Sequence, residues 1–323
     1  MEREQKLSKF IGSLLGTAIG DSLGARFEGT SGIQDVKEIG SRYTDDTAMT
    51  IGVAESLVEH KGFNYWYMAE RFIQNYEREP WRRYGSGPPR IFRMMQSGRM
   101  GFGMLDRDLY PGGSFGNGGA MRVGPVGLLY HDDPKSLREI SYHTTGITHS
   151  NEFALEGAAV QACAVALAVL ADPVDIKSSE FLGALRIFTQ PGPYQEKLKT
   201  VIRLLKEGAK KEQVVEELGN GVDALHSVAT AIYSFLANPG FENAVIYAVS
   251  LGGDADTIGS MCGAIAGACY GIEGIPEHWR RKVENHEYIE GLGGKLWELK
   301  EALGKPGLPV RGRVPCPSEL PER

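Results

Sequence analysis

The chain has 323 residues, enough to bury a hydrophobic core without disulfides, and its net charge of −6 comes from scattered acidic and basic residues. A nucleic-acid-binding stripe of Lys and Arg is absent, the four cysteines lack zinc-site spacing, and the most apolar stretch is too short and too interrupted to predict a membrane span. We therefore expect a cytoplasmic, monomeric protein with reduced thiols that binds neither nucleic acid nor membrane.

The first predicted element is a helix over residues 7–27, in which apolar residues recur at three- and four-residue steps. Gly12, Gly16, Gly20 and Gly24 repeat at every fourth position and form one bare face. Glycine inside a helix costs about 1 kcal/mol relative to alanine. Four glycines in register therefore indicate that another helix or a ligand approaches this face closely.

Helical periodicity recurs along most of the remaining chain, whereas strand-like alternation is nearly absent. The segments are 47–59, 64–76, 134–143, 151–171, 195–208, 211–218, 226–237, 241–250, 257–271 and 288–302. Segments 151–171 and 257–271 are apolar or small almost all round, which is typical of central helices. The sequence thus predicts one compact all-α domain of ten or more orthogonally packed helices over 1–303, followed by a Pro-rich tail at 304–323.

Residues 77–119 lack clear periodicity and are rich in Gly, Pro, Arg and Met. A structureless connection of this length is unusual in a compact domain unless it binds something. We interpret the segment as a functional loop.

An acidic cluster precedes the helix predicted from residue 47. Thr44 or Asp45 can cap that helix, and the carboxylates of Asp45 and Asp46 meet the positive end of its dipole. Capping alone accounts for one acid and leaves the second unexplained.

A second acidic cluster opens the helix predicted from residue 257. Asp254 and Asp256 lie one residue apart, and Thr257 adds a hydroxyl. An EF-hand is excluded, since Ile258 and Ile265 occupy positions that need oxygen ligands. Hard divalent cations prefer oxygen ligands, so the two clusters together predict a two-metal site more readily than two caps.

A glycine-rich loop at 112–122 exposes successive backbone N–H groups, which suits phosphate binding, although an irregular turn is the simpler alternative. The loop lacks the Lys-Ser/Thr ending of a P-loop, and no predicted strand precedes it, so kinase and dinucleotide-fold interpretations fail. Phe115 in this loop could stack on an aromatic ring or fill the core.

In this order the motifs resemble the ADP-ribosylglycohydrolase family across nearly the whole chain to about residue 300. They are Gly20-Asp21-Ser22-Leu23-Gly24 with Phe27-Glu28, YTDDTAM at 43–49, GSFGNGGAMR at 113–122, Thr148-His149-Ser150, GNG at 219–221, and SLGGDADTIGSMCGAIAGACYG at 250–271. The family fold is a single all-α domain with a binuclear Mg²⁺ cleft, so the resemblance implies two Mg²⁺ ions as cofactors.

The resemblance also implies site residues. The metal ligands would be Thr44, Asp45, Asp46, Asp254, Asp256 and Thr257. The residues that bind the substrate would be Gly113, Ser114, Phe115, Gly116, Asn117 and Gly118 at the diphosphate, with His149 in the cleft and Val222 near the adenine. A structural role for His149, as a helix cap or a core residue, is the alternative. Ala255 stands where a relative has Thr, and the tail has no counterpart.

Within the family, the glycine loop and Glu28 most resemble the branch that acts on serine-linked ADP-ribose, O-acetyl-ADP-ribose and poly(ADP-ribose). In that branch the glutamate that matches Glu28 lies on a mobile flap. The implied partners are thus ADP-ribose, ADP-ribosylated proteins or O-acetyl-ADP-ribose. We hypothesise that the metals hold the distal ribose while Glu28 or Asp254 transfers a proton. The alternatives are an arginine-ADP-ribose hydrolase, a non-catalytic ADP-ribose-binding or structural protein, and a metal-dependent phosphohydrolase, which the lack of paired histidines disfavours.

Overall fold

A computed structural model describes residues 3–38, 40–99, 101 and 103–304. These residues form sixteen α-helices and one 3-10 helix and contain no strand, so the prediction of an all-α fold is confirmed. In chain order the elements are α1 (Arg3–Gly24), α2 (Asp45–His60), α3 (Tyr65–Arg78), α4 (Gly87–Gln96), α5 (Met104–Leu109), α6 (Gly124–Leu129), α7 (Pro134–Thr145), α8 (Glu152–Leu170), α9 (Ser178–Phe188), α10 (Pro193–Glu207), α11 (Lys211–Leu218), α12 (Ala224–Ala237), α13 (Phe241–Ser250), α14 (Ala255–Tyr270), η1 (Ile272–Gly274), α15 (Glu277–Lys282) and α16 (His286–Leu303).

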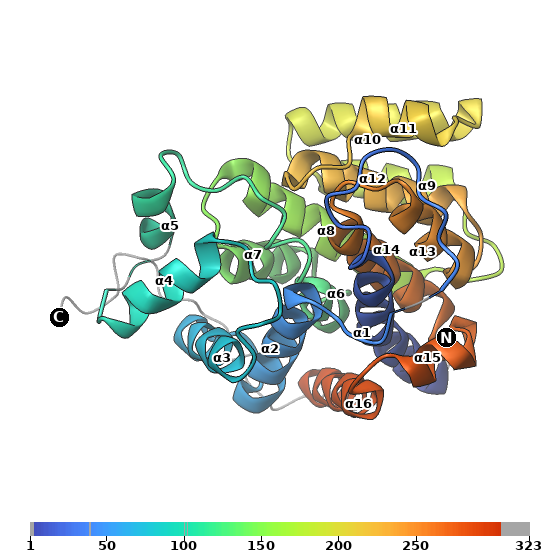
Figure 1. The fold of residues 1–323 in the computed structure, drawn as a ribbon. Coiled ribbons are helices and arrows are strands. Elements are labelled where there is room, and N and C mark those ends of the chain that lie inside the picture. Colours follow the sequence, from blue (N-terminus) through green and yellow to red (C-terminus); the bar gives the residue numbers. More distant parts are fainter. Residues whose placement is uncertain (1–2, 39, 100, 102, 305–323) are drawn as a thin grey trace.

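The centre of the fold is an antiparallel pair made by α1 and α14 (Figure 1). A Cβ at Gly16 would overlap the carbonyl oxygen of Gly263, and a Cβ at Gly20 would overlap that of Gly259. Both helices thus present glycines to each other, and the backbones touch directly. The bare face of the first helix contacts a helix and not a ligand. As a result, the C-terminal end of α1 at Gly24 lies against the backbone of Asp256 at the start of α14.

Helix α8 lies in the core, against α6, α7, α12 and α14. It is the one helix in the described part of the chain that is long and apolar enough to cross a membrane, but 78% of its apolar window is buried inside the protein. The expectation that this stretch is too short to span was therefore wrong, and tertiary burial accounts for its composition instead.

Residues 77–119 are more ordered than the sequence predicts, because they include α4 and α5. Ile91, Phe92 and Met95 form a buried stripe on α4, while Pro88 in its first turn is compatible with a helix start. Two of the connections between these helices, at 79–86 and 110–123, border the candidate site described below. The segment predicted to be one functional loop is therefore divided by two helices.

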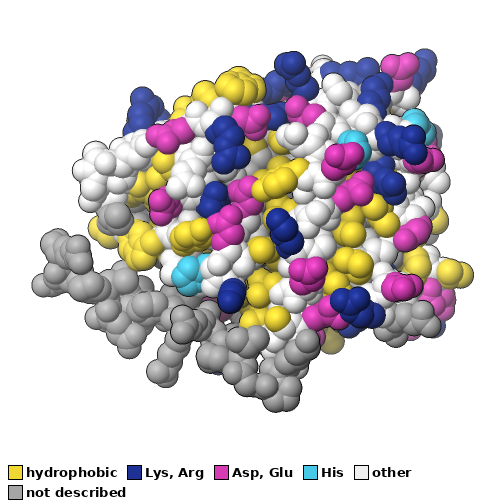
Figure 2. Space-filling view, turned by 90° about the horizontal axis from the view of Figure 1, so that it is seen from below, with side chains coloured by type: hydrophobic (Ala, Val, Ile, Leu, Met, Phe, Trp, Pro, Cys, Tyr) yellow, Lys and Arg dark blue, Asp and Glu magenta, His cyan; other side chains and the backbone are white. Residues whose placement is uncertain are grey.

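The charged surface is mixed on the face drawn in Figure 2, where basic and acidic side chains are interspersed among apolar ones. Helices α10 and α11 lie together on one side of the molecule and α16 on the opposite side (Figure 1). Of the predicted tail at 304–323, only Gly304 is among the described residues, so the proposed boundary at 303 falls at the end of α16.

Candidate functional site

The N-terminus of α2 supplies the first group of acids. Thr44 is the N-cap, and its hydroxyl accepts a hydrogen bond from the Asp46 N–H. Asp45 and Asp46 occupy the first turn, where the helix dipole favours negative charge. Asp46 is buried and Asp45 is half-buried, so the first turn brings two carboxylates into the interior.

The N-terminus of α14 supplies the second group. Gly252 and Gly253 adopt positive φ angles of 69° and 66°, which turn the chain sharply before the helix. The Asp254 N–H donates to the Asn220 carbonyl oxygen at 2.8 Å, and a Cβ at Gly253 would overlap that same oxygen. The GNG motif at 219–221 is therefore a backbone support for the turn, which places Asp254 and Asp256 at the start of α14.

The two groups meet because α1 places the start of α14 beside the start of α2. Asp46 accepts hydrogen bonds from the Ser260 hydroxyl at 2.8 Å and from the Thr257 hydroxyl at 3.4 Å. Asp254, on the other side, accepts from the Asn117 side-chain amide at 2.5 Å. The predicted convergence of the two acidic clusters is thus present in the structure.

Burial and mutual repulsion shift the pKa values of these acids upward. Burial, followed by the charge of Asp21, raises the pKa values of Asp45 and Asp46 well above their usual range. Burial, Asp254 and Asp21 raise the pKa of Asp256 to about 9. So many acids in one buried place are unfavourable without a cation to balance them.

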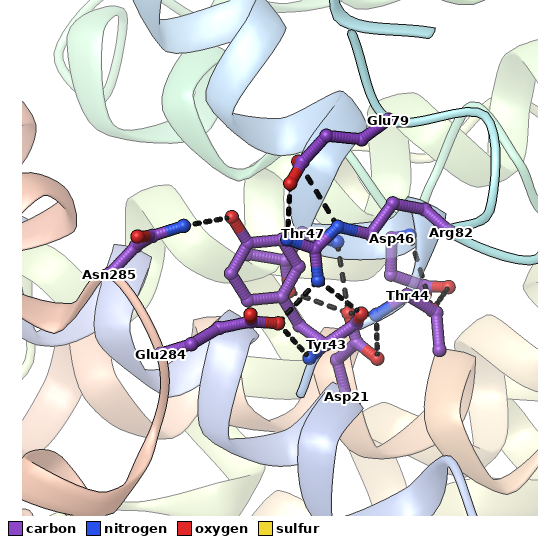
Figure 3. Close-up of polar contacts among 9 residues, drawn as sticks. All are labelled: Asp21, Tyr43, Thr44, Asp46, Thr47, Glu79, Arg82, Glu284 and Asn285. Atoms are coloured by element: carbon purple, nitrogen blue, oxygen red, sulfur yellow. Dashed lines mark hydrogen bonds and ion pairs between the residues drawn. The ribbon is translucent and has the colours of Figure 1, made fainter. Parts of the chain in front are cut away.

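Asp21 lies beneath this cluster and ties α1 to α2 (Figure 3). Its carboxylate accepts hydrogen bonds from the Thr44 N–H at 2.9 Å, the Thr47 N–H at 3.1 Å and the Thr47 hydroxyl at 2.6 Å. Burial raises the pKa of Asp21 to about 6, although these hydrogen bonds oppose the shift. The residue orients the first turn of α2 rather than facing the cleft.

Arg82 holds the same turn from the opposite side (Figure 3). Its guanidinium donates to the Tyr43 carbonyl oxygen at 3.0 Å, lies 4.0 Å from the centroid of the Tyr43 ring, and forms ion pairs with Glu79 and Glu284. The connection that begins after α3 is thereby fixed to the residue that precedes Thr44.

The glycine-rich loop lies on the other side of the acids. The Asn117 N–H donates to the Val222 carbonyl oxygen at 2.9 Å, and the Ala224 N–H donates to the Phe115 carbonyl oxygen at 3.0 Å. The Gly118 N–H makes no hydrogen bond within the described chain, and Gly118 lines the cleft. The loop is therefore a supported backbone with a donor left for a ligand.

Glu28 lies at the mouth of the site and is 44% exposed. Its carboxylate pairs with Arg83 at 3.2 Å. The segment that carries Glu28 is fixed at its base by two backbone hydrogen bonds, from the Gly29 N–H to Gly253 at 2.7 Å and from the Gly253 N–H to Thr30 at 2.8 Å. It therefore joins the turn that presents the second acidic cluster.

Together these groups surround a cleft of about 320 Å³, within the size range of small-molecule sites. Twelve of the fifteen predicted site residues line it: Glu28, Asp45, Asp46, Ser114, Gly116, Asn117, Gly118, His149, Val222, Asp254, Asp256 and Thr257. Thr44 and Gly113 do not line the cleft. The Thr44 hydroxyl donates a hydrogen bond to the Asp46 carboxylate at 3.2 Å, and Gly113 packs against Ser150. Phe115 is 57% exposed, so the suggestion that it fills the core is wrong.

The sequence analysis missed several residues that line the cleft. They are Arg83, Gly85, Ser86, Gly87, Pro88, Tyr110, Met121, Arg122 and Thr148. Six of them lie within 77–119, where only the length and composition pointed to function. The other three, Met121, Arg122 and Thr148, belonged to the quoted motifs, but nothing in the sequence indicated their contacts.

The chemistry of the donors fits a hard divalent cation. Four aspartates and Thr257 line one cleft, and burial together with the repulsion between neighbouring acids raises the pKa values of Asp46 and Asp256. In the described parts of the chain, no three His, Cys, Asp or Glu side chains are close enough to hold an ion by themselves. Magnesium, however, needs few protein ligands because it retains water molecules.

Comparison with known proteins agrees with the motifs. The sequence profile of the ADP-ribosylglycohydrolase family matches residues 2–306. The ADP-ribosylhydrolase ARH3 of Bos taurus is 34% identical over 346 residues, covering 90% of this chain and 93% of that protein. The Danio rerio ARH3 is 36% identical over 337 residues, covering 91% of each.

A more distant relative and a solved structure also match most of the chain. The ADP-ribosylarginine hydrolase Tri1 of Pseudomonas putida (strain GB-1) is 25% identical over 316 residues, covering 91% of this chain and 79% of that protein. A solved structure, an ADP-ribosylglycohydrolase-related protein complex, superimposes with a TM-score of 0.71 at 28% identity and covers 92% of this chain and 99% of that one. The resemblance inferred from the motifs is confirmed: the chain belongs to the ADP-ribosylglycohydrolase family and is an ADP-ribosyl hydrolase.

Proposed function

We propose that this protein is a Mg²⁺-dependent hydrolase that cleaves the glycosidic bond between ADP-ribose and an acceptor, with serine-linked ADP-ribose, O-acetyl-ADP-ribose or poly(ADP-ribose) as its substrates. The observation that carries the proposal is the single cleft in which two acidic helix N-termini face a glycine-rich loop. The identity of 34% to ARH3, against 25% to the arginine hydrolase Tri1, supports the choice of branch.

The ends of the cleft have complementary roles. The Gly118 N–H and its neighbours would bind the diphosphate, since backbone donors suit phosphate oxygens. Val222 is 65% exposed at the edge of the cleft, where an adenine could pack on it. A ligand anchored in this way would extend its distal ribose toward Asp45 and Asp254.

Two Mg²⁺ ions would be held by the acids and hydroxyls already named. The residues that would hold them are Thr44, Asp45, Asp46, Asp254, Asp256 and Thr257. When bound, the ions supply Lewis-acid chemistry at the ribose oxygens. Their charge would also offset the repulsion that raises the pKa values of the carboxyls.

Two carboxylates, those of Glu28 and Asp254, are the candidates for proton transfer. Glu28 is exposed at the mouth of the cleft, where it can reach the leaving oxygen of the acceptor. Asp254 is buried and is held by the Asn117 amide, which fixes the position of its carboxylate. The geometry favours Glu28 for proton transfer and Asp254 for holding the ribose and its ion.

The decisive experiment measures release of free ADP-ribose from a serine-ADP-ribosylated peptide, with Mg²⁺ and with EDTA, beside an arginine-linked peptide. Mg²⁺-dependent release from serine alone supports the proposal. Release from arginine alone transfers the protein to the other branch. Tight binding of ADP-ribose without release from either peptide would make the protein a non-catalytic ADP-ribose-binding protein. Full turnover by Asp256→Ala without metal would refute the metal-dependent mechanism.

A further inference from the structure

Arg122 is a fully buried cation on the wall of the cleft, with 0% of its surface exposed. Its Nη2 donates to the Thr144 carbonyl oxygen at 3.0 Å and to the Thr148 hydroxyl oxygen at 2.8 Å, and the guanidinium lies 4.7 Å from the ring centroid of Phe72. A guanidinium can only donate hydrogen bonds. Thr148 must therefore accept from Arg122.

The Thr148 hydroxyl also contacts His149, with 2.8 Å between Oγ1 and Nδ1. Thr148 is buried, and no third partner of its hydroxyl exists among the described residues. If Nδ1 carried a proton and donated, the hydroxyl hydrogen would be buried without an acceptor, which is unfavourable. The hydroxyl hydrogen therefore points to Nδ1, and Nδ1 accepts.

A neutral imidazole that accepts at Nδ1 carries its proton at Nε2. Burial, and then the nearby charge of Arg122, lower the pKa of His149 to about 3, so the ring is neutral at pH 7. Nε2 has no hydrogen-bond partner in the described chain and lies against the glycine loop, 3.0 Å from where a Cβ at Gly118 would be. Both His149 and Gly118 line the cleft.

We propose that Arg122 and Thr148 are positioning residues that hold His149 as the Nε2–H tautomer, so that His149 donates a hydrogen bond to a ligand oxygen lying on Gly116–Gly118. The ligand oxygen belongs to the phosphate or hydroxyl class, because the Nε2–H of His149 and the free N–H of Gly118 are both donors and need an acceptor oxygen. The identity of that ligand rests on the proposed function, whereas the tautomer does not.

The tautomer is measured without any ligand. Protein labelled with ¹⁵N-histidine is examined by long-range ¹H–¹⁵N correlation at pH 7, and the His149→Gln variant assigns the His149 signals. The wild type is expected to show the Nε2–H pattern. Thr148→Ser is expected to preserve this pattern and the Nδ1 resonance, whereas Thr148→Val is expected to move the Nδ1 resonance downfield, because Nδ1 no longer accepts a hydrogen bond. A wild type with Nδ1–H, or a Thr148→Val variant whose Nδ1 resonance does not move, would overturn the proposal.

Thr144→Val is a matched control. The Thr144 hydroxyl is buried without a hydrogen bond, and its backbone carbonyl, which Arg122 uses, is retained in the variant. This control is expected to leave the His149 pattern unchanged. If Thr148→Val does not fold by circular dichroism, Thr148→Ala replaces it, and the wild-type spectrum alone can still contradict the inference.

Calorimetric titration with ADP-ribose then tests the consequence for binding. Thr148→Val is expected to weaken binding about tenfold, which corresponds to about 1.4 kcal/mol, while Thr148→Ser and Thr144→Val bind as the wild type does. Equal affinity of Thr148→Val and the wild type would contradict the role of the donor. A wild type that does not bind ADP-ribose refutes the proposed function instead. The assignment of the His149 tautomer would not be affected, because the ¹⁵N spectrum measures it without a ligand.

Discussion

The Asp21 carboxylate near the end of α1 accepts a hydrogen bond from the Thr47 hydroxyl in α2 at 2.6 Å, and it also accepts from the N–H groups of Thr44 and Thr47. One carboxylate therefore fixes the turn that carries three of the proposed metal ligands, Thr44, Asp45 and Asp46. Mutation of a residue that orients a metal ligand through hydrogen bonds typically weakens metal binding 10–100-fold.

We expect Asp21→Asn to weaken Mg²⁺ binding about 10–100-fold, because an amide NH₂ cannot accept the hydrogen bonds that Asp21 accepts from Thr47. Isothermal titration calorimetry measures the effect. Ser22→Ala is the control, since the neighbouring Ser22 hydroxyl is buried without a partner. An Asp21→Asn variant that binds Mg²⁺ like the wild type would show that Asp21 has no influence on the ions.

Removing a carboxylate from the cluster should stabilise the metal-free protein. Asp256 is buried beside other acids, and these surroundings disfavour its charged form. Asp256→Asn is expected to raise the melting temperature in EDTA and to abolish the further rise that Mg²⁺ gives the wild type. Thermal denaturation with and without Mg²⁺ tests both effects. A lower melting temperature in EDTA would mean that the repulsion is already balanced within the chain.

Glu28→Gln should separate binding from chemistry. The side chain lies at the cleft mouth and supports no buried structure, so ADP-ribose affinity should be preserved while turnover falls by about 10²–10⁴-fold. Glu38→Gln, an exposed acid in the same connection, serves as the control. Unchanged turnover in Glu28→Gln would assign the proton transfer to Asp254.

The contact between α1 and α14 predicts a large difference between two glycine substitutions. Gly16→Ala places a methyl group onto the Gly263 carbonyl oxygen, so we expect loss of several kcal/mol of stability or failure to fold. Gly291→Ala, on the exposed face of α16, meets nothing within 4 Å and should be neutral or stabilising by up to about 1 kcal/mol. Urea denaturation compares the two, and equal stabilities would disprove the backbone contact.

The depressed pKa of His149 predicts a pH dependence of stability. The folded pKa of about 3 lies below the unfolded value near 6.5, so the unfolded state binds the extra proton between these values and stability falls as the pH drops below about 6.5. Between pH 7 and pH 5 the wild type should lose roughly 2 kcal/mol relative to His149→Gln. Urea denaturation at both pH values measures this difference. Parallel losses in both proteins would show that His149 is accessible to protons in the fold.

The acidic clusters and the all-α fold could be predicted because their signals are local. Two carboxylates at a helix start, or a three- to four-residue apolar period, are visible in a short window of sequence. Helix α4 was missed because Pro88, Pro89 and its arginines resemble a loop composition, although its buried stripe is regular. Helix α6 was missed because all six of its residues are buried and show no polar face.

The supporting residues of the site could not be predicted for a different reason. Asp21 is a single acid within a helix, and its partners are in α2. Arg122 is a charged residue that becomes fully buried only because α7 and Thr148 supply acceptors for it. Such roles depend on contacts between distant segments, which neither periodicity nor spacing encodes.

The glycine pairing of α1 and α14 limits how the site can change. Two helices that interlock every four residues can slide only in steps of about 6 Å, because each residue rises by about 1.5 Å. One such step would carry the start of α14 away from the start of α2 and separate Asp256 from Asp46. Mutations therefore cannot shift the acids at the start of α14 gradually relative to those at the start of α2. Preferences for new acceptors therefore have to arise from changes in the surrounding loops, while the α1–α14 pair beneath them keeps its register.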